Sequence, residues 1–304
     1  MNMQPRSQCG FTLVEMIIVI VITGIIGGMV AMFIRAPVQG YVDSSRRAEM
    51  TDIADTALRR LARDLRTAVP NSVRLPTPAG STYIEFLPTR DGGRYRVNDD
   101  GGILCGAAGD DLAFNASDTC FAIIGSPIPF LAGDAIVVGS TQSSGNPPYC
   151  KTTTCTVAAI VEPGVLRDYT GAAGAQAVVV MAGAAKFPDS AEVEGYRFEV
   201  VPGDQQAVTY ACVNPGGGGC ATGADGDGTC QLMRYWSYGF NSTQVAPAAL
   251  AGPSTAILAD RVSACNFVYD IGNKRNSLVA VSLTITRGNE SVNLYHEIHI
   301  NNIP

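Results

Sequence analysis

The feature that most constrains this chain is an apolar stretch near its N-terminus, Phe11 to Ile34, in which Glu15 is the only charged residue. As a helix, this stretch would extend about 36 Å, which is enough to cross the hydrocarbon layer of a membrane. A polar leader, MNMQPRSQCG, precedes it and ends on Gly10. A secretory signal carries its cleavage site after the apolar region, whereas this small residue comes before it. Cleavage after Gly10 would therefore leave the helix attached to the mature protein.

Glu15 is unusual because an isolated carboxylate in a membrane helix costs about 2.5–3.5 kcal/mol at the centre of the bilayer and less near an interface. Cleavage after Gly10 would give Phe11 a free, positively charged α-amino group. That amine could pair with Glu15 of a neighbouring subunit and neutralise both charges in a low dielectric. The alternative is that Glu15 lies at the membrane interface and extends its carboxylate to water. The first interpretation predicts assembly through the helix.

A second, amphipathic helix is expected beyond the apolar stretch. Together with the apolar stretch it should form one long helix, which Pro37 kinks or restarts. Apolar residues then recur at i, i+3 and i+4 spacing up to Pro70, where the helix should end. They are Met50, Ile53, Ala54, Ala57, Leu58, Leu61, Leu65 and Ala68. This stripe is predicted to pack on the protein's own sheet.

The rest of the chain is β-rich, and the predicted fold class is α+β, with a long N-terminal helix packed on an antiparallel sheet. Short β-prone runs alternate with Gly, Pro, Asn and Asp turns. Strands are expected at 83–87, 135–138, 156–161, 177–181, 196–201, 207–212, 232–238, 264–269, 278–285 and 292–300. Turns are expected at 272–276 and 287–289, and Gly-rich loops at about 97–130, 140–153 and 213–229. The predicted divisions are a leader (1–10), a transmembrane helix (11–35), an amphipathic helix (36–70) and a β-rich domain (71–304).

The cysteines indicate that the β-rich domain is exported. Cys9 precedes the apolar stretch, and eight cysteines follow it: Cys105, Cys120, Cys150, Cys155, Cys212, Cys220, Cys230 and Cys265. An even number on one side of a membrane segment is typical of disulfides in an oxidising compartment. Cys150–Cys155 and Cys105–Cys120 are the expected pairs, although spacing does not fix the connectivity. A zinc site is disfavoured because two matching short-spaced cysteine pairs are missing.

Several function classes fit the sequence poorly. The formal net charge of −6 argues against nucleic acid as a partner. The only histidines, His296 and His299, are three apart in a predicted strand and so should point to opposite faces. There is no nucleophile elbow and no phosphate-binding loop. The run Asp225–Gly228 resembles part of a calcium loop but lacks the terminal acidic ligand. We therefore expect no enzyme activity, cofactor or metal.

The segment GFTLVE, Gly10 to Glu15, resembles the leader junction of type IV pilins and of type II secretion pseudopilins. The resemblance implies that a prepilin peptidase cuts between Gly10 and Phe11 and methylates Phe11. It also implies that Glu15 guides docking with other pilins in the inner membrane. Gly24 matches a glycine near which pilin helices loosen. The proline frequent in the family's membrane half is missing, since Met32 stands there and Pro37 comes later.

A weaker resemblance extends beyond the N-terminus, in Pro37–Tyr41, Arg59–Arg74 and Tyr295–Pro304. These segments resemble a large minor pilin of the MSHA biogenesis O type, and they are also similar to the J-type minor pseudopilin. Both are low-copy subunits that prime assembly or sit at the tip. The resemblance implies a single-pass inner-membrane protein with a periplasmic C-terminal domain. A rival of another class is a membrane-anchored adhesin or binding module that uses the loops at 97–130 and 213–229.

Overall fold

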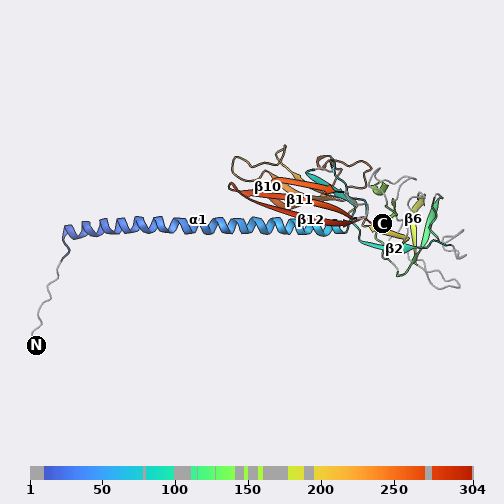
Figure 1. Ribbon diagram of the computed structural model, residues 1–304, viewed down its shortest axis with the longest axis horizontal. Coiled ribbons are helices and arrows are strands. Elements are labelled where there is room, and N and C mark those ends of the chain that lie inside the picture. The colour runs from blue at the N-terminus through green and yellow to red at the C-terminus, as the bar shows by residue number, and fades with distance from the viewer. Residues whose placement is uncertain are drawn as a thin grey trace, which may run out of the picture. The chain divides into compact units, whose positions relative to one another are not determined.

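The computed structural model describes residues 10–77, 80–98, 111–114, 116–126, 128–140, 147–149, 157–159, 177–187, 195–270 and 276–302. The chain divides into two compact units, Met1–Glu49 and Met50–Pro304. One helix, α1 (Leu13–Arg66), contributes its first part to the first unit and its last part to the second (Figure 1).

The expected long helix is present, because α1 runs through 54 residues with Pro37 inside it and does not restart there. A proline in a helix removes a single backbone donor and crowds the carbonyl four residues earlier. The residues on both sides of Pro37 continue the helix. The helix also ends earlier than expected, at Arg66. Thr67 N donates to Asp64 O and Ala68 N to Leu65 O, both at 3.1 Å, so a tighter turn closes the helix.

The larger core lies between the last part of α1 and a six-stranded sheet, which confirms the α+β fold class. The strand order is β1-β8-β9-β10-β11-β12, and the neighbours are antiparallel. Met50, Leu58, Leu61 and Leu65 of the predicted stripe are buried against this sheet. The strands are β1 (Tyr83–Phe86), β8 (Val208–Val213), β9 (Cys230–Trp236), β10 (Ser254–Asp270), β11 (Asn276–Arg287) and β12 (Glu290–Asn301).

A second six-stranded sheet was not expected as a separate layer. Its order is β5-β4-β7-β2-β3-β6, again antiparallel, with its own core around Phe121, Phe198 and Tyr95. The strands are β2 (Asp91–Tyr95), β3 (Asp118–Ile124), β4 (Ala135–Val138), β5 (Val157–Ala159), β6 (Ala177–Ala185) and β7 (Arg197–Val201). β2 and β3 were missed, and β3 lies where a loop at 97–130 was predicted.

The two sheets share a smaller apolar cluster. Ala135, Val137 and Val201 of the second sheet pack with Ala211 and Tyr235 of the first. The connection from β7 to β8 is short. Within it, Gly203 packs against Gly133. A Cβ added to Gly203 would lie 2.2 Å from the carbonyl carbon of Gly133, so only glycine fits at this crossing.

A buried ion pair secures the segment between α1 and the first sheet. Arg74 Nε donates to Glu85 Oε2 at 2.8 Å, and the two side chains are 10% and 1% exposed. The guanidinium also donates to the carbonyls of Ser242 (3.1 Å) and Asn241 (2.7 Å). It stacks 3.5 Å from the ring centroid of Tyr149. Every part of this cation therefore has a partner inside the fold.

The end of β12 joins the same segment. Asn302 is buried, and its Oδ1 accepts from the backbone N–H of Asn71 at 3.1 Å. Its Nδ2 donates to Ser277 Oγ at 2.7 Å and to Tyr269 OH at 3.1 Å. One side chain thus ties the last strand to β10, to β11 and to the residues that follow α1.

Two disulfides secure the first sheet. Cys212–Cys265 links β8 to β10 and closes a separation of 53 residues, while Cys220–Cys230 closes one of 10. Cys120 is also disulfide-bonded. The expected pairs Cys150–Cys155 and Cys105–Cys120 include Cys105, Cys150 and Cys155, which lie outside the described residues.

Loss of the longer bridge should destabilise the β-rich unit more than loss of the shorter one. The double variant Cys212→Ser/Cys265→Ser should lose about 4 kcal/mol of unfolding free energy, and Cys220→Ser/Cys230→Ser about 3 kcal/mol, because the longer loop restricts the unfolded chain more. Urea unfolding followed by fluorescence of Trp236, the single tryptophan, measures both. A larger loss for the shorter bridge would contradict this order.

Candidate functional site

The N-terminal junction is open in the structure. Gly10 and Phe11 are exposed, Phe11 by 86%, and no atom lies within 4 Å of a Cβ built on Gly10. Both residues precede the first residue of α1, Leu13. The peptide bond between them thus lies in exposed chain outside the helix, which a peptidase can reach.

Thr12 and Glu15 form a capping box at the start of α1. The backbone N–H of Thr12 donates to Glu15 Oε2 at 3.0 Å, and the Thr12 hydroxyl donates to the same oxygen at 3.1 Å. The N–H of Glu15 donates back to Thr12 Oγ1 at 3.3 Å. This is the reciprocal arrangement of the Thr-x-x-Glu motif, and the carboxylate also complements the positive end of the helix dipole. Glu15 therefore caps its own helix. The Thr-x-x-Glu spacing in the sequence is a signal that predicts this role.

The first part of α1 exposes its apolar side chains on every face. All described side chains from residue 10 to residue 42 are exposed. Within the described chain, α1 is the one helix whose length and composition would let it cross a membrane. An apolar surface of this extent requires a lipid layer or other apolar helices around it. The hydroxyl of Thr23 donates to the carbonyl of Val19 at 2.5 Å, so this polar group needs no outside partner.

Three glycines open the surface of the same stretch. No atom lies within 4 Å of a Cβ built on Gly24, Gly27 or Gly28. Small residues of this kind let the backbones of neighbouring membrane helices approach closely. The stretch thus provides both an apolar surface and a place for close helix packing.

The family model of the prokaryotic N-terminal methylation motif matches residues 5–32. The chain carries a type IV pilin-like N-terminus. This match covers the leader junction, Glu15 and most of the apolar stretch, and it supports the type IV pilin and pseudopilin class. A comparison with curated proteins and one with solved structures each found no match. The motif's family is structural rather than enzymatic.

The histidines of this pilin-like chain do not form a site. His296 is half-buried and faces α1 beside Arg59, Arg63 and Arg66, whereas His299 is exposed. The predicted opposite orientation along β12 is therefore confirmed. Within the described ranges, no group of three or more His, Cys, Asp or Glu side chains could hold a metal ion.

In the calcium-like run Asp225–Gly228, the carboxylate of Asp227 is hydrogen-bonded to other parts of the protein. Asp227 accepts from Arg261 Nε and from the backbone N–H of Gly288, both at 2.8 Å. The Gly288 N–H and then the Arg261 guanidinium lower the pKa of Asp227. Its carboxylate links the loop after β8 to β10 and to the β11–β12 turn, so its role here is structural.

Proposed function

We propose that the chain is a minor pilin that takes part in assembly, as a priming or tip subunit, of a type IV pilus of the MSHA type. The observation that carries the proposal is the Gly10–Phe11 junction, which is exposed and stands directly before an apolar helix capped by Glu15. In this proposal a prepilin peptidase cuts after Gly10 and methylates Phe11. The apolar stretch then stays in the inner membrane as a single span, and the β-rich unit is periplasmic.

The proposed docking step uses the new terminus. The α-amino group of Phe11 would pair with Glu15 of a neighbouring subunit, since two opposite charges in a low dielectric attract strongly and neither remains unpaired. The open surface around Gly24, Gly27 and Gly28 would let the two helices approach. Other pilins or pseudopilins are the proposed partners.

Two features support a low-copy role. The β-rich unit contains two six-stranded sheets, so it is bulky for a subunit that repeats along a fibre. The segments Arg59–Arg74 and Tyr295–Pro304 resemble the O-type minor pilin. The same segments also resemble the J-type pseudopilin, which is the second candidate. Deletion of the gene should abolish pili in the first case and type II secretion in the second.

Processing provides the direct test. Purified from cells that contain prepilin peptidase, the chain should lack residues 1–10 and carry one methyl group on Phe11. Purified from cells without the peptidase, it should retain the leader, and intact-protein mass spectrometry distinguishes the two forms. A Gly10→Lys variant should keep its leader even with the peptidase, because a long side chain then occupies the open position beside the cleaved bond. An identical mass with and without the peptidase would overturn the proposal.

A further inference from the structure

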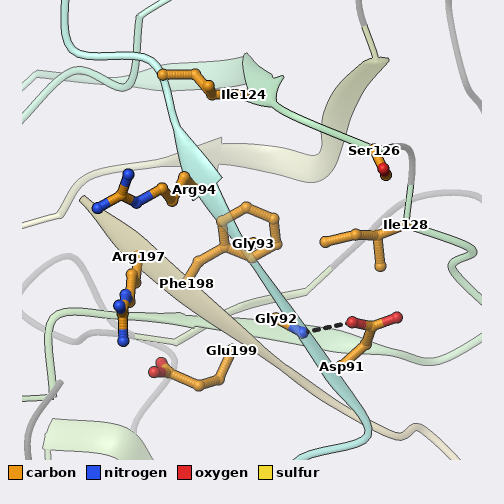
Figure 2. Close-up of a pocket in the computed structure, with 10 residues that line it drawn as sticks. All are labelled: Asp91, Gly92, Gly93, Arg94, Ile124, Ser126, Ile128, Arg197, Phe198 and Glu199. Carbon is orange, nitrogen blue, oxygen red and sulfur yellow. Dashed lines mark hydrogen bonds between the residues drawn. The ribbon is translucent and has the colours of Figure 1, made fainter. Parts of the chain in front are cut away.

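The proposed pilin function makes no use of a polar pocket on the second sheet. Its volume is about 640 Å³, and β2 and β7 supply most of its lining. The charged residues around it are Asp91 and Arg94 of β2 and Arg197 and Glu199 of β7. Figure 2 shows Arg94, Arg197 and Glu199 extending to the same side of this strand pair. A cavity of this size is in the range of small-molecule sites.

The strand register leaves one carboxylate oxygen of Glu199 without a donor. Its neighbours across the sheet are Gly92 on β2, which has no side chain, and Val137 on β4, which is apolar. The Oε2 atom of Glu199 is buried and has no hydrogen-bond partner. A buried oxygen without a donor destabilises the fold, because it loses its hydration and gains no hydrogen bond in return.

The same register places two cations opposite each other. Arg94 pairs with Arg197 on β7 and with Ile124 on β3, so neither neighbour offers an acceptor. No hydrogen bond or ion pair joins either guanidinium to another group in the described part of the chain. Like charges directly opposite in a sheet are destabilising. A like-charge pair and a carboxylate oxygen without a donor thus lie side by side on one face.

We propose that this face binds a small zwitterion of the α-amino-acid type, whose carboxylate contacts Arg94 and Arg197 and whose ammonium contacts Glu199. Such a ligand resolves both unfavourable features at once. Two guanidiniums match the planar fork of a carboxylate, and an ammonium supplies the donor that Oε2 lacks. Ile124 is half exposed at the rim and offers an apolar contact for the rest of the ligand.

The ionisation of Glu199 gives the proposal a pH signature. Burial raises the pKa of Glu199 to about 7, against the lowering effects of Arg197 and of its own backbone N–H. Arg94, Arg197 and Asp91 are the charged groups around it. Because an ammonium prefers the ionised carboxylate, affinity should rise at least about tenfold from pH 5 to pH 8.

The test uses the full chain in detergent and three probes that differ in one group. L-leucine carries both charges, 2-hydroxy-4-methylpentanoate keeps only the carboxylate, and L-leucinamide keeps only the ammonium. Isothermal titration calorimetry should give a Kd for L-leucine of about 1 mM or tighter, and at least about tenfold weaker binding for the other two. Equal affinity for all three probes, or no binding of L-leucine, would overturn the proposal.

Variants assign the site. Arg94→Gln and Glu199→Gln should each weaken L-leucine binding at least about tenfold, and Glu199→Gln should also remove the rise with pH. Arg63→Gln on α1, which changes the charge by the same amount away from this face, should leave the affinity unchanged. Equal urea midpoints by Trp236 fluorescence confirm that each variant is folded. A Glu199→Gln protein that binds L-leucine like the parent would contradict the assignment.

Discussion

Replacing Arg74 by Met should destabilise the β-rich unit by about 3–5 kcal/mol, because it leaves Glu85 buried without its cation. Glu85 is 1% exposed, and its remaining partner is the hydroxyl of Tyr238, which donates to Oε1 at 3.1 Å. The carbonyls of Asn241 and Ser242 would lose their donors in the same change. Urea unfolding of the detergent-solubilised chain, followed by Trp236 fluorescence, measures the loss.

The charge on Glu85 makes this loss depend on pH. Burial already raises the pKa of Glu85, although Arg74 and then Tyr238 lower it. Without Arg74 the carboxyl should stay protonated to higher pH in the folded state than in the unfolded state. Stability of the variant therefore falls as the pH rises above the unfolded pKa of Glu85. The difference from the parent should be larger at pH 8 than at pH 5.

Two further variants separate the charge from the packing. The double variant Arg74→Met/Glu85→Gln removes both charges and should recover part of the loss. Arg59→Met breaks a surface pair in which Arg59 and Asp55 are 74% and 44% exposed, so it should change stability by less than about 1 kcal/mol. An Arg74→Met loss no larger than the Arg59→Met loss would show that the buried pair contributes little.

Replacing Glu15 by Leu should reduce incorporation of the subunit into assembled fibres at least about tenfold, which corresponds to about 1.4 kcal/mol of docking energy. Insertion into the membrane should be unaffected or improved, because a buried charge is removed. The amount of subunit in sheared fibres relative to the membrane fraction measures the effect. Normal incorporation of the Leu variant would contradict the docking role.

Thr12→Val is the matched control for this experiment. It removes the hydroxyl that bonds to Glu15 but keeps the carboxylate and its bond from the Thr12 backbone N–H, so the hydroxyl half of the capping box is lost while the docking acid remains. Loss of the cap should weaken the helix start by about 1 kcal/mol. Incorporation of Thr12→Val should therefore stay close to the parent level. Equal defects in the two variants would show that capping, rather than docking, is what assembly requires.

Local patterns in the sequence predicted most of the first sheet. In β12 the half-buried and buried residues Leu294, His296, Ile298 and Ile300 alternate with exposed ones, as their spacing indicates. The β11–β12 turn also lies as predicted, with Gly288 and Asn289 at positive φ. The predicted turn at 272–276 falls outside the described residues, except for Asn276, which begins β11.

The strands that the sequence did not predict, or predicted too short, have physical explanations. β2 reads DGGRY, and its two glycines suggest a turn, yet pairing with β3 and β7 on both sides holds it in a sheet. Strand β10 is much longer than the predicted 264–269 because register shifts at 257–259, 259–262 and 262–264 break its alternation. Such irregularities depend on the partner strands and leave little local signal.

The two candidate sites also differ in how far the sequence alone reveals them. The residues Gly10, Phe11 and Glu15 are adjacent in the chain, so their motif is visible in the sequence. The zwitterion site depends on which residues of β2 and β7 face each other, and a shift of one position would send Arg94 and Glu199 to opposite faces. Only the register reveals it.

The bonds of Asn302 set an order on folding. The segment after α1 is held by the hydrogen bond from the backbone N–H of Asn71 to the side chain of Asn302. These two residues are separated by 231 positions. If the chain crosses the membrane from its N-terminal end, α1 is available long before residue 302 emerges. This hydrogen bond therefore cannot form until the last strand has been made available. A chain stopped short of that residue would lack these bonds and would leave the residues after α1 open to proteolysis.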